Sequence, residues 1–508
     1  METPVNLQTR TVSLAFNIGF TRTIYYLDDM SWPLWFGVLL AAAALLTALG
    51  EITARRGWIS LFAARKGVHI TVAICCALAV EILPTSIWFT GAVGLIVLLL
   101  WYSVRKQWFS IDQIDGRRSW GIFYFGLSYF LLLVLFGQQS PFTVMLGMAV
   151  MGLADSVAAL IGKMLPHPRL TLGRETKSWA GSTVFFIITG SLLFSLTRDR
   201  PGMDGSDYTA LSMVALVFWL TVVENSAGKG TDNLSVPLLF GWVYATLIES
   251  GDASLQERFL WVFIPAALFA LVTARIKFLT RDGAVSAASL GTLLYTYGGW
   301  NYVVPILFFF LTGSLLGRLL NPKAKSVEKS GARDPWQVLA NGGVPALGLL
   351  WGYHAGEPSL GFILFAAALA SVTADTWSTE IGMRFGGTPR HILNGKKMAK
   401  GLSGGVTLAG FFGALCGTSL IALIVHWFDP TIPVLWIIIL GFAGSILDSV
   451  AGVFQAKYQL KESGSWSEKR LENGIQISGV SWWTNDLVNA FSALLILLIS
   501  ALFFGAAG

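Results

Sequence analysis

The sequence predicts an all-α polytopic membrane protein whose roughly 16 transmembrane helices form two parallel repeats of eight. Of the 508 residues, 54% are hydrophobic and only 13% are charged, far from the composition of soluble domains. Apolar stretches of near membrane-spanning length recur from residue 31 to the end of the chain. Lysine and arginine gather in every second loop, as they do in cytoplasmic loops. These long apolar runs indicate helices rather than a membrane barrel.

The expected spans divide evenly around the polar segment Gly251 to Glu257. The first eight lie near residues 31–50, 68–84, 86–104, 119–137, 140–163, 179–197, 208–224 and 234–250. The second eight lie near residues 258–275, 284–299, 301–320, 335–353, 358–383, 402–427, 431–455 and 485–506. We therefore expect two membrane domains, residues 1–255 and 256–508, with polar loops at 323–335 and 457–485.

The basic character of the chain, a formal net charge of +6, follows from this topology. Cations that collect at helix ends on one side of a membrane set its orientation, so no nucleic-acid partner is expected. The three cysteines lie in apolar runs without metal-ligand spacing and are read as packing residues. We expect an integral protein of a bacterial inner membrane, with its sites on the cytoplasmic face.

Acids inside apolar segments are the main functional signal, because an ionisable group there is costly unless it is compensated. Asp375 and Glu380 follow an apolar run, and a basic, glycine-rich loop follows them up to Gly405. A similar segment runs from Gly152 to Ser182. At a separation of 220 residues, Ala154, Asp155 and Gly162 match Ala374, Asp375 and Gly382; at 223 residues, Arg174, Lys177 and Gly181 match Lys397, Lys400 and Gly404.

These two segments suit the binding of a metal and of phosphates. Fixed carboxylates suit Mg²⁺, which keeps waters and shares ligands with substrate phosphates. Lysines and glycine N–H groups suit the phosphates themselves. An ordinary ion pair at the membrane surface is the alternative for either segment alone.

A second acidic position follows in each half. Glu224 and Asp448 each close an apolar span on the basic side. The pairs Asp232 with Asn233 and Asn485 with Asp486 then precede the next expected helix, where helix capping explains them as well as ligation does. Arg65, Lys66 and His69 open another expected helix, and membrane anchoring explains them at least as well as substrate contact.

Soluble nucleotide-binding signatures are absent from the sequence. It holds no GxxxxGK[ST] P-loop, no kinase HRD with DFG and no GxGxxG after a strand. Any use of nucleotide therefore requires a fold embedded in the membrane.

The motifs resemble two families of lipid kinase. The first half resembles the CTP-dependent phytol kinase and dolichol (polyprenol) kinase group, through RKGVHI, GLADSVAALIG, GRETKSWAGS, VEN and DNLSVPL. The second half resembles the phytyl-phosphate kinases of tocopherol synthesis, through SVTADTWSTEIG, NGKKMAKGLSGG, GSILDSVAG and NDLVN. The first half departs from its family at VENSAGKGTDN, where an ESLP-like run is expected after the glutamate.

The resemblance implies that the chain phosphorylates an isoprenoid alcohol such as phytol first to the monophosphate and then to the diphosphate, with CTP or another nucleoside triphosphate as donor and Mg²⁺ as cofactor. Phytol salvage from chlorophyll or prenylquinone synthesis would be the setting. By residue carry-over, the first site holds Asp155, Lys177, Glu224 and Asp232, and the second holds Asp375, Glu380, Lys400, Asp448 and Asp486. The residues expected to bind the nucleotide are Arg174, Gly181, Ser182, Asp232, Asn233, Lys396, Lys397, Gly404 and Gly405.

Two other classes remain open at this point. A secondary transporter also combines parallel repeats with intramembrane acids, although its sites tend to lie near the bilayer midplane. A cytidylyltransferase that forms a CDP-lipid would use a similar set of groups. Release of pyrophosphate would indicate nucleotidyl transfer, and release of CDP would indicate a kinase.

Overall fold

The computed structural model describes residues 32–83, 85–108, 113–114, 117–165, 168–171, 176–198, 200, 207–320, 332–460, 466–468 and 474–505. Contacts within the chain divide it into two compact units, Met1–Gln256 and Glu257–Gly508, here called unit 1 and unit 2. This division lies next to the one expected from the polar segment before Glu257.

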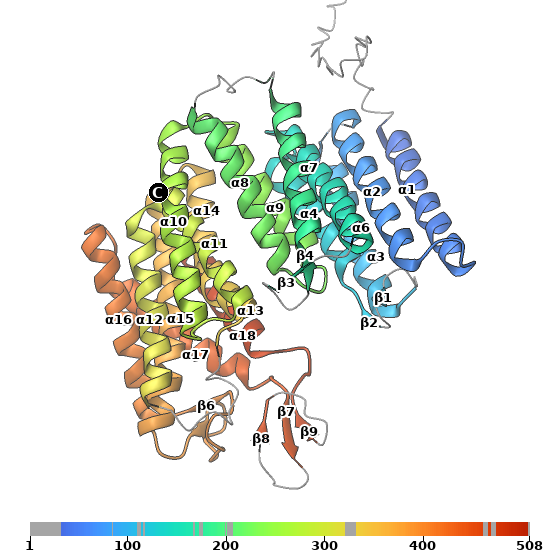
Figure 1. The fold of residues 1–508 in the computed structure, drawn as a ribbon. Helices are drawn as coiled ribbons and strands as arrows, with labels where there is room; N and C mark the ends of the chain where they lie inside the picture. Colours follow the sequence, from blue (N-terminus) through green and yellow to red (C-terminus); the bar gives the residue numbers. More distant parts are fainter. Residues whose placement is uncertain are drawn as a thin grey trace, which may run out of the picture. The chain divides into compact units, whose positions relative to one another are not determined.

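Unit 1 is a bundle of helices with two short hairpins at one end (Figure 1). Its helical segments are α1 (Trp32–Arg55), α2 (Leu61–Ile82), α3 (Ile87–Lys106), α4 (Gly121–Phe136), α5 (Pro141–Ala149), the π-helical η2 (Val150–Asp155), α6 (Ser156–Met164), α7 (Trp179–Thr197), α8 (Asp207–Ser226), α9 (Asp232–Val243) and η3 (Tyr244–Ile248). The hairpins are β1 (Gln113–Ile114) with β2 (Arg117–Arg118) and β3 (Arg169–Leu170) with β4 (Lys177–Ser178).

Unit 2 is also helical. Its segments are α10 (Ala253–Arg275), which begins just before the division, α11 (Arg281–Gly298), α12 (Trp300–Leu320), α13 (Pro335–Val338), the π-helical η6 (Leu339–Gly343), α14 (Val344–Ala355), α15 (Pro358–Phe385), α16 (Leu408–Phe428), α17 (Val434–Gly452) and α18 (Asn485–Gly505). Its strands are β5 (Arg390–His391) with β6 (Gly405–Val406), and the antiparallel sheet of β8 (Trp466–Ser467), β7 (Lys457–Leu460) and β9 (Gly474–Ser478).

The all-α polytopic class is confirmed. When directly continuous segments are joined, the described residues form 16 helices. Of these helices, 12 are long and apolar enough to cross a membrane. The other four are shorter or less apolar. The polar 457–485 loop contains the only three-stranded sheet among the described residues, which its composition did not predict.

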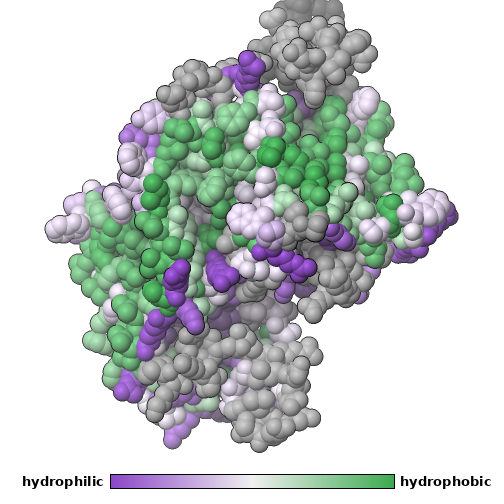
Figure 2. Space-filling model, viewed as in Figure 1, coloured by the Kyte–Doolittle hydropathy of each residue, from purple (hydrophilic) through white to green (hydrophobic). Residues whose placement is uncertain are grey.

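The helices turn hydrophobic side chains outward, as a lipid environment requires. Leu95, Leu98 and Leu99 of α3 and Trp261 and Ile264 of α10 are exposed. On the face shown in Figure 2, hydrophobic side chains cover the long helices and hydrophilic ones gather near helix ends. In water such a surface would be a large apolar patch, so the composition and the exposure together indicate a bilayer.

Helix starts follow local capping chemistry in both units. A serine, threonine or aspartate side chain accepts the N–H three residues later at Ser60, Ser86, Ser140, Ser178, Thr280, Asp334 and Thr407. Each such cap stabilises its helix by about 1 kcal/mol. The caps explain why α2 begins before the apolar run, at Leu61, and why α16 begins only at Leu408.

In unit 2, α15 is the central helix. Its stretch from Leu364 to Ala374 is buried and rich in alanine. Small side chains allow the neighbouring helices α14, α16 and α17 to approach closely. This packing fixes Asp375, which comes directly after the buried stretch.

Candidate functional site

Three carboxylates that are far apart in the sequence meet in unit 1. Asp155 ends η2, Glu224 lies in the last turn of α8, and Asp232 begins α9. One carboxylate oxygen from each lies within 4.8 Å of the others. Asp155 and Glu224 are buried. The structure therefore brings together the first-half acids predicted from the sequence, and hard oxygen ligands in this arrangement fit Mg²⁺.

Two lysines neutralise much of this negative charge. The Lys66 Nζ lies 2.5 Å from the Asp155 Oδ2 and both side chains are buried. Lys177 is paired with Glu224 and lies 3.5 Å from the Asp232 Oδ2. Burial by itself would lower the pKa of Lys177, but the carboxylates of Glu224, Asp232 and Asp155 outweigh burial and raise the pKa, so the amine stays charged.

Lys66 was not predicted as a site residue. Anchoring of α2 explained its charge equally well, and its partner lies 89 residues further along the chain. The sequence did carry one signal. A lysine inside a membrane helix needs a partner of opposite charge, and Asp155 is a buried acid in the same unit.

The β3–β4 hairpin brings Lys177 to the acids. Ser178 caps α7 and accepts the Gly181 N–H at 3.1 Å. A Cβ on Gly181 would come within 3.0 Å of the Ala158 carbonyl oxygen, so only glycine permits α7 to lie this close to α6. The Ser182 hydroxyl donates to the Asn225 side chain at 2.7 Å, next to Glu224. Arg174, the other predicted phosphate ligand of this loop, lies outside the described residues.

Asn233 holds the end of α9 against α4. Its Nδ2 donates to the Gly121 carbonyl oxygen at 2.8 Å, while its backbone N–H donates to the Asp232 Oδ1 at 3.1 Å. Asn233 therefore fixes the start of α9, and with it the position of Asp232. Asp232 lies in the first turn of α9, just after the N-cap residue Thr231, and its carboxylate faces the other acids.

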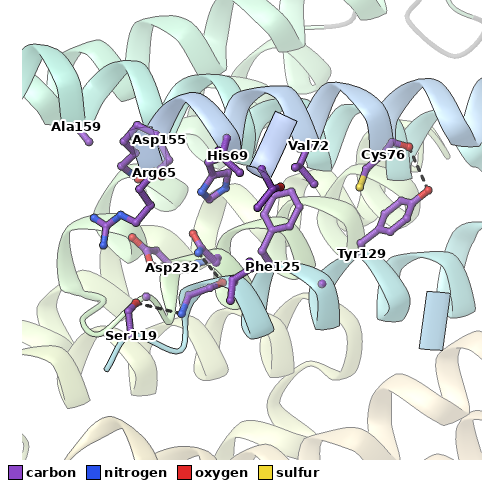
Figure 3. A pocket seen from close by; sticks show the side chains of 18 of the residues that line it. Arg65, His69, Val72, Cys76, Ser119, Phe125, Tyr129, Asp155, Ala159 and Asp232 are labelled. Atoms are coloured by element: carbon purple, nitrogen blue, oxygen red, sulfur yellow. Dashed lines mark hydrogen bonds and ion pairs between the residues drawn. The ribbon is translucent and has the colours of Figure 1, made fainter. Parts of the chain in front are cut away.

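A cavity of about 1470 Å³ opens beside the acids and lies wholly within unit 1. Charged and polar groups surround one end: Arg65, Lys66, Asp155, Lys163, Lys177, Glu224 and Asp232. Apolar side chains of α1 to α4 line the remainder, and Phe36, Ala79, Phe89 and Tyr129 lie along it. Figure 3 shows Asp155, Arg65 and Asp232 at one side of the view and Cys76 and Tyr129 at the other, with His69 between them.

One face of α2 runs along the whole cavity. Its lining residues recur at helical spacing: Arg65, Lys66, Val68, His69, Val72, Cys75, Cys76 and Ala79. At 1.5 Å of rise per residue, Lys66 and Ala79 lie about 20 Å apart along the axis. The cavity therefore combines a charged head with a long apolar arm, a shape that suits a molecule with one polar end and a hydrocarbon chain.

A smaller polar cavity of about 80 Å³ lies in unit 2. Its lining includes the acids Asp375 of α15 and Asp448 of α17, with Lys400, Gly404 and Gly405 of the basic loop. Asn485, at the start of α18, also lines it. The structure thus brings together five of the predicted site residues of the second half, namely Asp375, Lys400, Gly404, Gly405 and Asp448.

Other predicted residues of unit 2 lie elsewhere. Asp486 is in the first turn of α18 but does not line this cavity. Lys396 and Lys397 are exposed, and they too are not among the lining residues. Glu380 is buried against α12, where a Cβ on Gly317 would lie 3.3 Å from its Oε1. Burial lowers the pKa of the neighbouring Arg333 to about 10, and Glu380 partly offsets that effect.

Two supporting contacts in unit 2 had no signal in the sequence. The Glu468 carboxylate accepts the Ser403 N–H at 2.5 Å and the Ser403 hydroxyl at 3.1 Å, which ties the basic loop to the β7–β9 sheet. Oriented with its nitrogen toward α17, the Asn489 amide donates to the Asp448 Oδ2 at 3.0 Å. Both contacts join residues of different elements, so only the fold discloses them.

The glycine correspondence between the halves differs from the one predicted. In unit 1, Gly162 and Gly181 lie against each other where two helices cross, and in unit 2 Gly382 and Gly410 do the same. The helix caps are also alike. Thr407 accepts the Gly410 N–H at the start of α16, as Ser178 accepts the Gly181 N–H at the start of α7. Gly404, the predicted match of Gly181, instead lies in the loop against Val453. Gly404 therefore does not make the contacts of its predicted counterpart Gly181, whereas Gly162 and Gly382 make similar contacts.

Together, the helices and these acid and lysine clusters define an integral membrane protein with polar sites built from residues within and at the ends of its helices. Comparison with known proteins gives the particular family. The integral membrane protein DUF92 family matches residues 264–497, and the chain belongs to this family. No solved structure is significantly similar to the chain.

Three relatives extend the comparison. The chain is 30% identical over 194 residues to the uncharacterized membrane protein MJ0933 of Methanocaldococcus jannaschii, which covers 37% of this chain and 80% of the relative. It is 28% identical over 287 residues to protein PGR of Arabidopsis thaliana, and this match covers 49% of this chain and 98% of the relative. It is 31% identical over 234 residues to the phytol kinase of Synechocystis, and this match covers 42% of this chain and 94% of the relative. The chain is thus a distant homologue of phytol kinase over less than half of its length.

Proposed function

We propose that the chain is a bifunctional isoprenoid-alcohol kinase. Unit 1 phosphorylates phytol or a similar alcohol to the monophosphate, and unit 2 phosphorylates the monophosphate to the diphosphate. The observation that carries the proposal is the cavity of unit 1, in which a charged head continues into an apolar arm that extends about 15 Å along α2 from His69 to Ala79. The homology with phytol kinase supports the same class of substrate.

The charged head suits phosphoryl transfer, which requires mainly positioning and charge neutralisation. Asp155, Glu224 and Asp232 would hold Mg²⁺, which neutralises triphosphate charge when it is bound. Lys66 and Lys177 supply two further cations at the same place. The donor is a nucleoside triphosphate, and the resemblance of the motifs favours CTP.

The second step is proposed for unit 2 on the basis of its smaller polar cavity. Asp375 and Asp448 provide carboxylates, and Lys400 with the Gly404 and Gly405 backbone provides cationic and N–H groups for phosphates. A volume of about 80 Å³ accommodates head groups rather than a long chain. The two units are proposed as parallel repeats, supported by the two similar glycine crossings and N-caps, with both sites on the cytoplasmic face of a bacterial inner membrane.

The test uses membranes that contain the whole chain, radiolabelled phytol, CTP and Mg²⁺. We expect phytyl monophosphate, then diphosphate, with CDP released in step with phosphate transfer. Pyrophosphate together with a CDP-lipid would instead indicate a cytidylyltransferase. Movement of a solute across sealed vesicles without any product would indicate a transporter, and either result would overturn the proposal.

A further inference from the structure

His69 occupies the boundary between the charged head and the apolar arm of the unit 1 cavity (Figure 3). It lies one turn beyond Lys66 on the same face of α2, about 4.5 Å further along the helix axis. The hydroxyl of an alcohol whose chain fills the apolar arm must lie near this boundary, because the triphosphate belongs with the charges and the chain with the apolar side chains. This step rests on the function proposed above.

The imidazole of His69 has an unused polar atom. Its Nε2 is buried and has no hydrogen-bond partner, and it is the only such side-chain atom among the described residues that line this cavity. A buried polar atom without a partner is uncommon and calls for an explanation. The ring of Phe125 packs edge to face against the imidazole, with 4.6 Å between ring centroids, and shields it from water.

Four charged groups surround His69, and the two carboxylates among them already have lysine partners. The four groups are Asp155 at the end of η2, Asp232 at the start of α9, and Lys66 and Arg65 on the same helix as His69. Asp155 is paired with Lys66, and Asp232 lies against Lys177. The imidazole is therefore the group at this boundary that is available to the hydroxyl.

We propose that His69 is the catalytic base that accepts the proton of the isoprenoid hydroxyl. As the hydroxyl oxygen forms its bond to the terminal phosphorus of the nucleoside triphosphate, the proton moves to Nε2. The bond between that phosphorus and the bridging oxygen breaks, and the nucleoside diphosphate leaves with the electron pair. The imidazolium then loses its proton to water, which restores the neutral ring.

The two nucleophiles of the proposed pathway differ in their need for a base. An alcohol must lose a proton, whereas a phosphate monoester, with a second pKa of about 6, is already mostly ionised at pH 7. In unit 1 the base lies nine residues after the α2 cap Ser60, whereas the residue nine after the α11 cap Thr280 is Ser289, and no histidine is among the described residues that line the unit 2 cavity. The chemistry of each step thus agrees with the residue that each helix carries.

The test compares His69→Gln with His354→Gln, the same change at an exposed histidine of α14, in the full chain in membranes with CTP and Mg²⁺. We expect His69→Gln to reduce kcat for phytol by about 10²-fold to 10⁴-fold with KM for CTP little changed. Phosphorylation of supplied phytyl monophosphate should stay at the wild-type rate. His354→Gln should change neither step.

A second measurement separates base catalysis from a structural part. A saturated phytol analogue with two fluorines on the carbon next to the hydroxyl carbon has a more acidic hydroxyl, so it should lose less activity in His69→Gln than the same saturated alcohol without fluorine loses. This ratio does not depend on how much protein is folded, because both rates scale with the same active fraction. Equal losses for the two alcohols, or a loss below about tenfold for phytol, would overturn the proposal for His69. If wild-type protein forms no monophosphate at all, the proposed function itself fails.

Discussion

The apolar arm of the unit 1 cavity should set the length of the alcohol that the protein accepts. Ala79 is the lining residue of α2 furthest from Lys66, and it is buried. A phenyl ring needs an apolar space of roughly 150 Å³. Ala79→Phe should therefore exclude about four methylene-sized groups of the chain. At about 0.8 kcal/mol each, this costs about 3 kcal/mol of binding, or about a 100-fold decrease in kcat/KM for phytol.

The assay measures kcat/KM for phytol and for an isoprenoid alcohol with half as many carbons, whose chain ends before Ala79. The shorter alcohol should lose less than about threefold, because it buries the same surface in both proteins. Leu78→Phe is the matched control. Leu78 neighbours Ala79 on α2 but is 47% exposed, so a ring there points away from the cavity.

Two results would refute this reasoning. Equal losses for the long and the short alcohol would mean that the ring damages the bundle rather than shortening the arm. Unchanged kinetics for phytol in protein that inserts normally would mean that the hydrocarbon chain does not lie along α2.

Four further predictions concern the charged groups. Asp155→Asn should stop phosphorylation of the free alcohol but not of supplied monophosphate, and Asp375→Asn should make monophosphate accumulate; loss of both steps in either variant would indicate one composite site. Lys400→Ala should raise KM for CTP or for the monophosphate in the second step by about tenfold or more. Lys396→Ala, at an exposed lysine outside the cavity, is the control. Kinetics of Lys400→Ala equal to those of the wild type would remove Lys400 from the site. Lys66→Met should lower the free energy of unfolding by about 3–5 kcal/mol, because it leaves the Asp155 carboxylate buried without a cation; a normal midpoint in thermal unfolding would contradict this. Glu468→Gln should weaken the charge-assisted hydrogen bonds to Ser403, which contribute about 1.5–3 kcal/mol. Amide hydrogen exchange in the basic loop should then become faster. Unchanged exchange would show that the sheet does not hold that loop.

Most of the helices could be predicted because hydrophobic length is a strong signal in a membrane chain. The boundaries failed where charge and capping compete with apolarity. The second expected span began at residue 68, since Arg65 and Lys66 interrupt the apolar run, yet α2 begins at Leu61. The Ser60 cap permits the earlier start, and the pairing of Lys66 with Asp155 makes the lysine tolerable inside the helix. A tertiary contact therefore decided a boundary that local sequence could not.

The acids of unit 1 were predictable for a related reason. A carboxylate within a membrane helix is costly, so Asp155 and Glu224 stood out against their apolar surroundings. Lys177 stood out with them through its motif, but Lys66, the partner of Asp155, did not, because a lysine near a helix end is expected for topology alone. The cavity also had no signal, since its apolar lining looks like any other helix face in the sequence.

Alignment of the two halves by residue type is least dependable where their loops differ in length. Between Gly162 and Gly181 the chain advances 19 residues, and between Gly382 and Gly410 it advances 28. The longer loop carries the extra lysines, so comparison of residue types placed the glycine of the crossing too early, at Gly404. The helix caps Ser178 and Thr407 indicate a different correspondence, and their positions are fixed by hydrogen bonds rather than by composition.

The contrast between the two cavities follows from what each proposed substrate offers for recognition. A free isoprenoid alcohol has one weakly polar group, so burial of its chain must supply most of the binding energy, and a long apolar arm beside a charged head meets that need. Its monophosphate carries charge that lysine and glycine N–H groups can bind directly, while its chain can remain in the bilayer. A small polar cavity between Asp375, Asp448 and Lys400 is then sufficient. On this reasoning, closing the apolar arm with Ala79→Phe should impair the first phosphorylation and leave the second unchanged, and a matching loss in the second step would show that both substrates use the same arm.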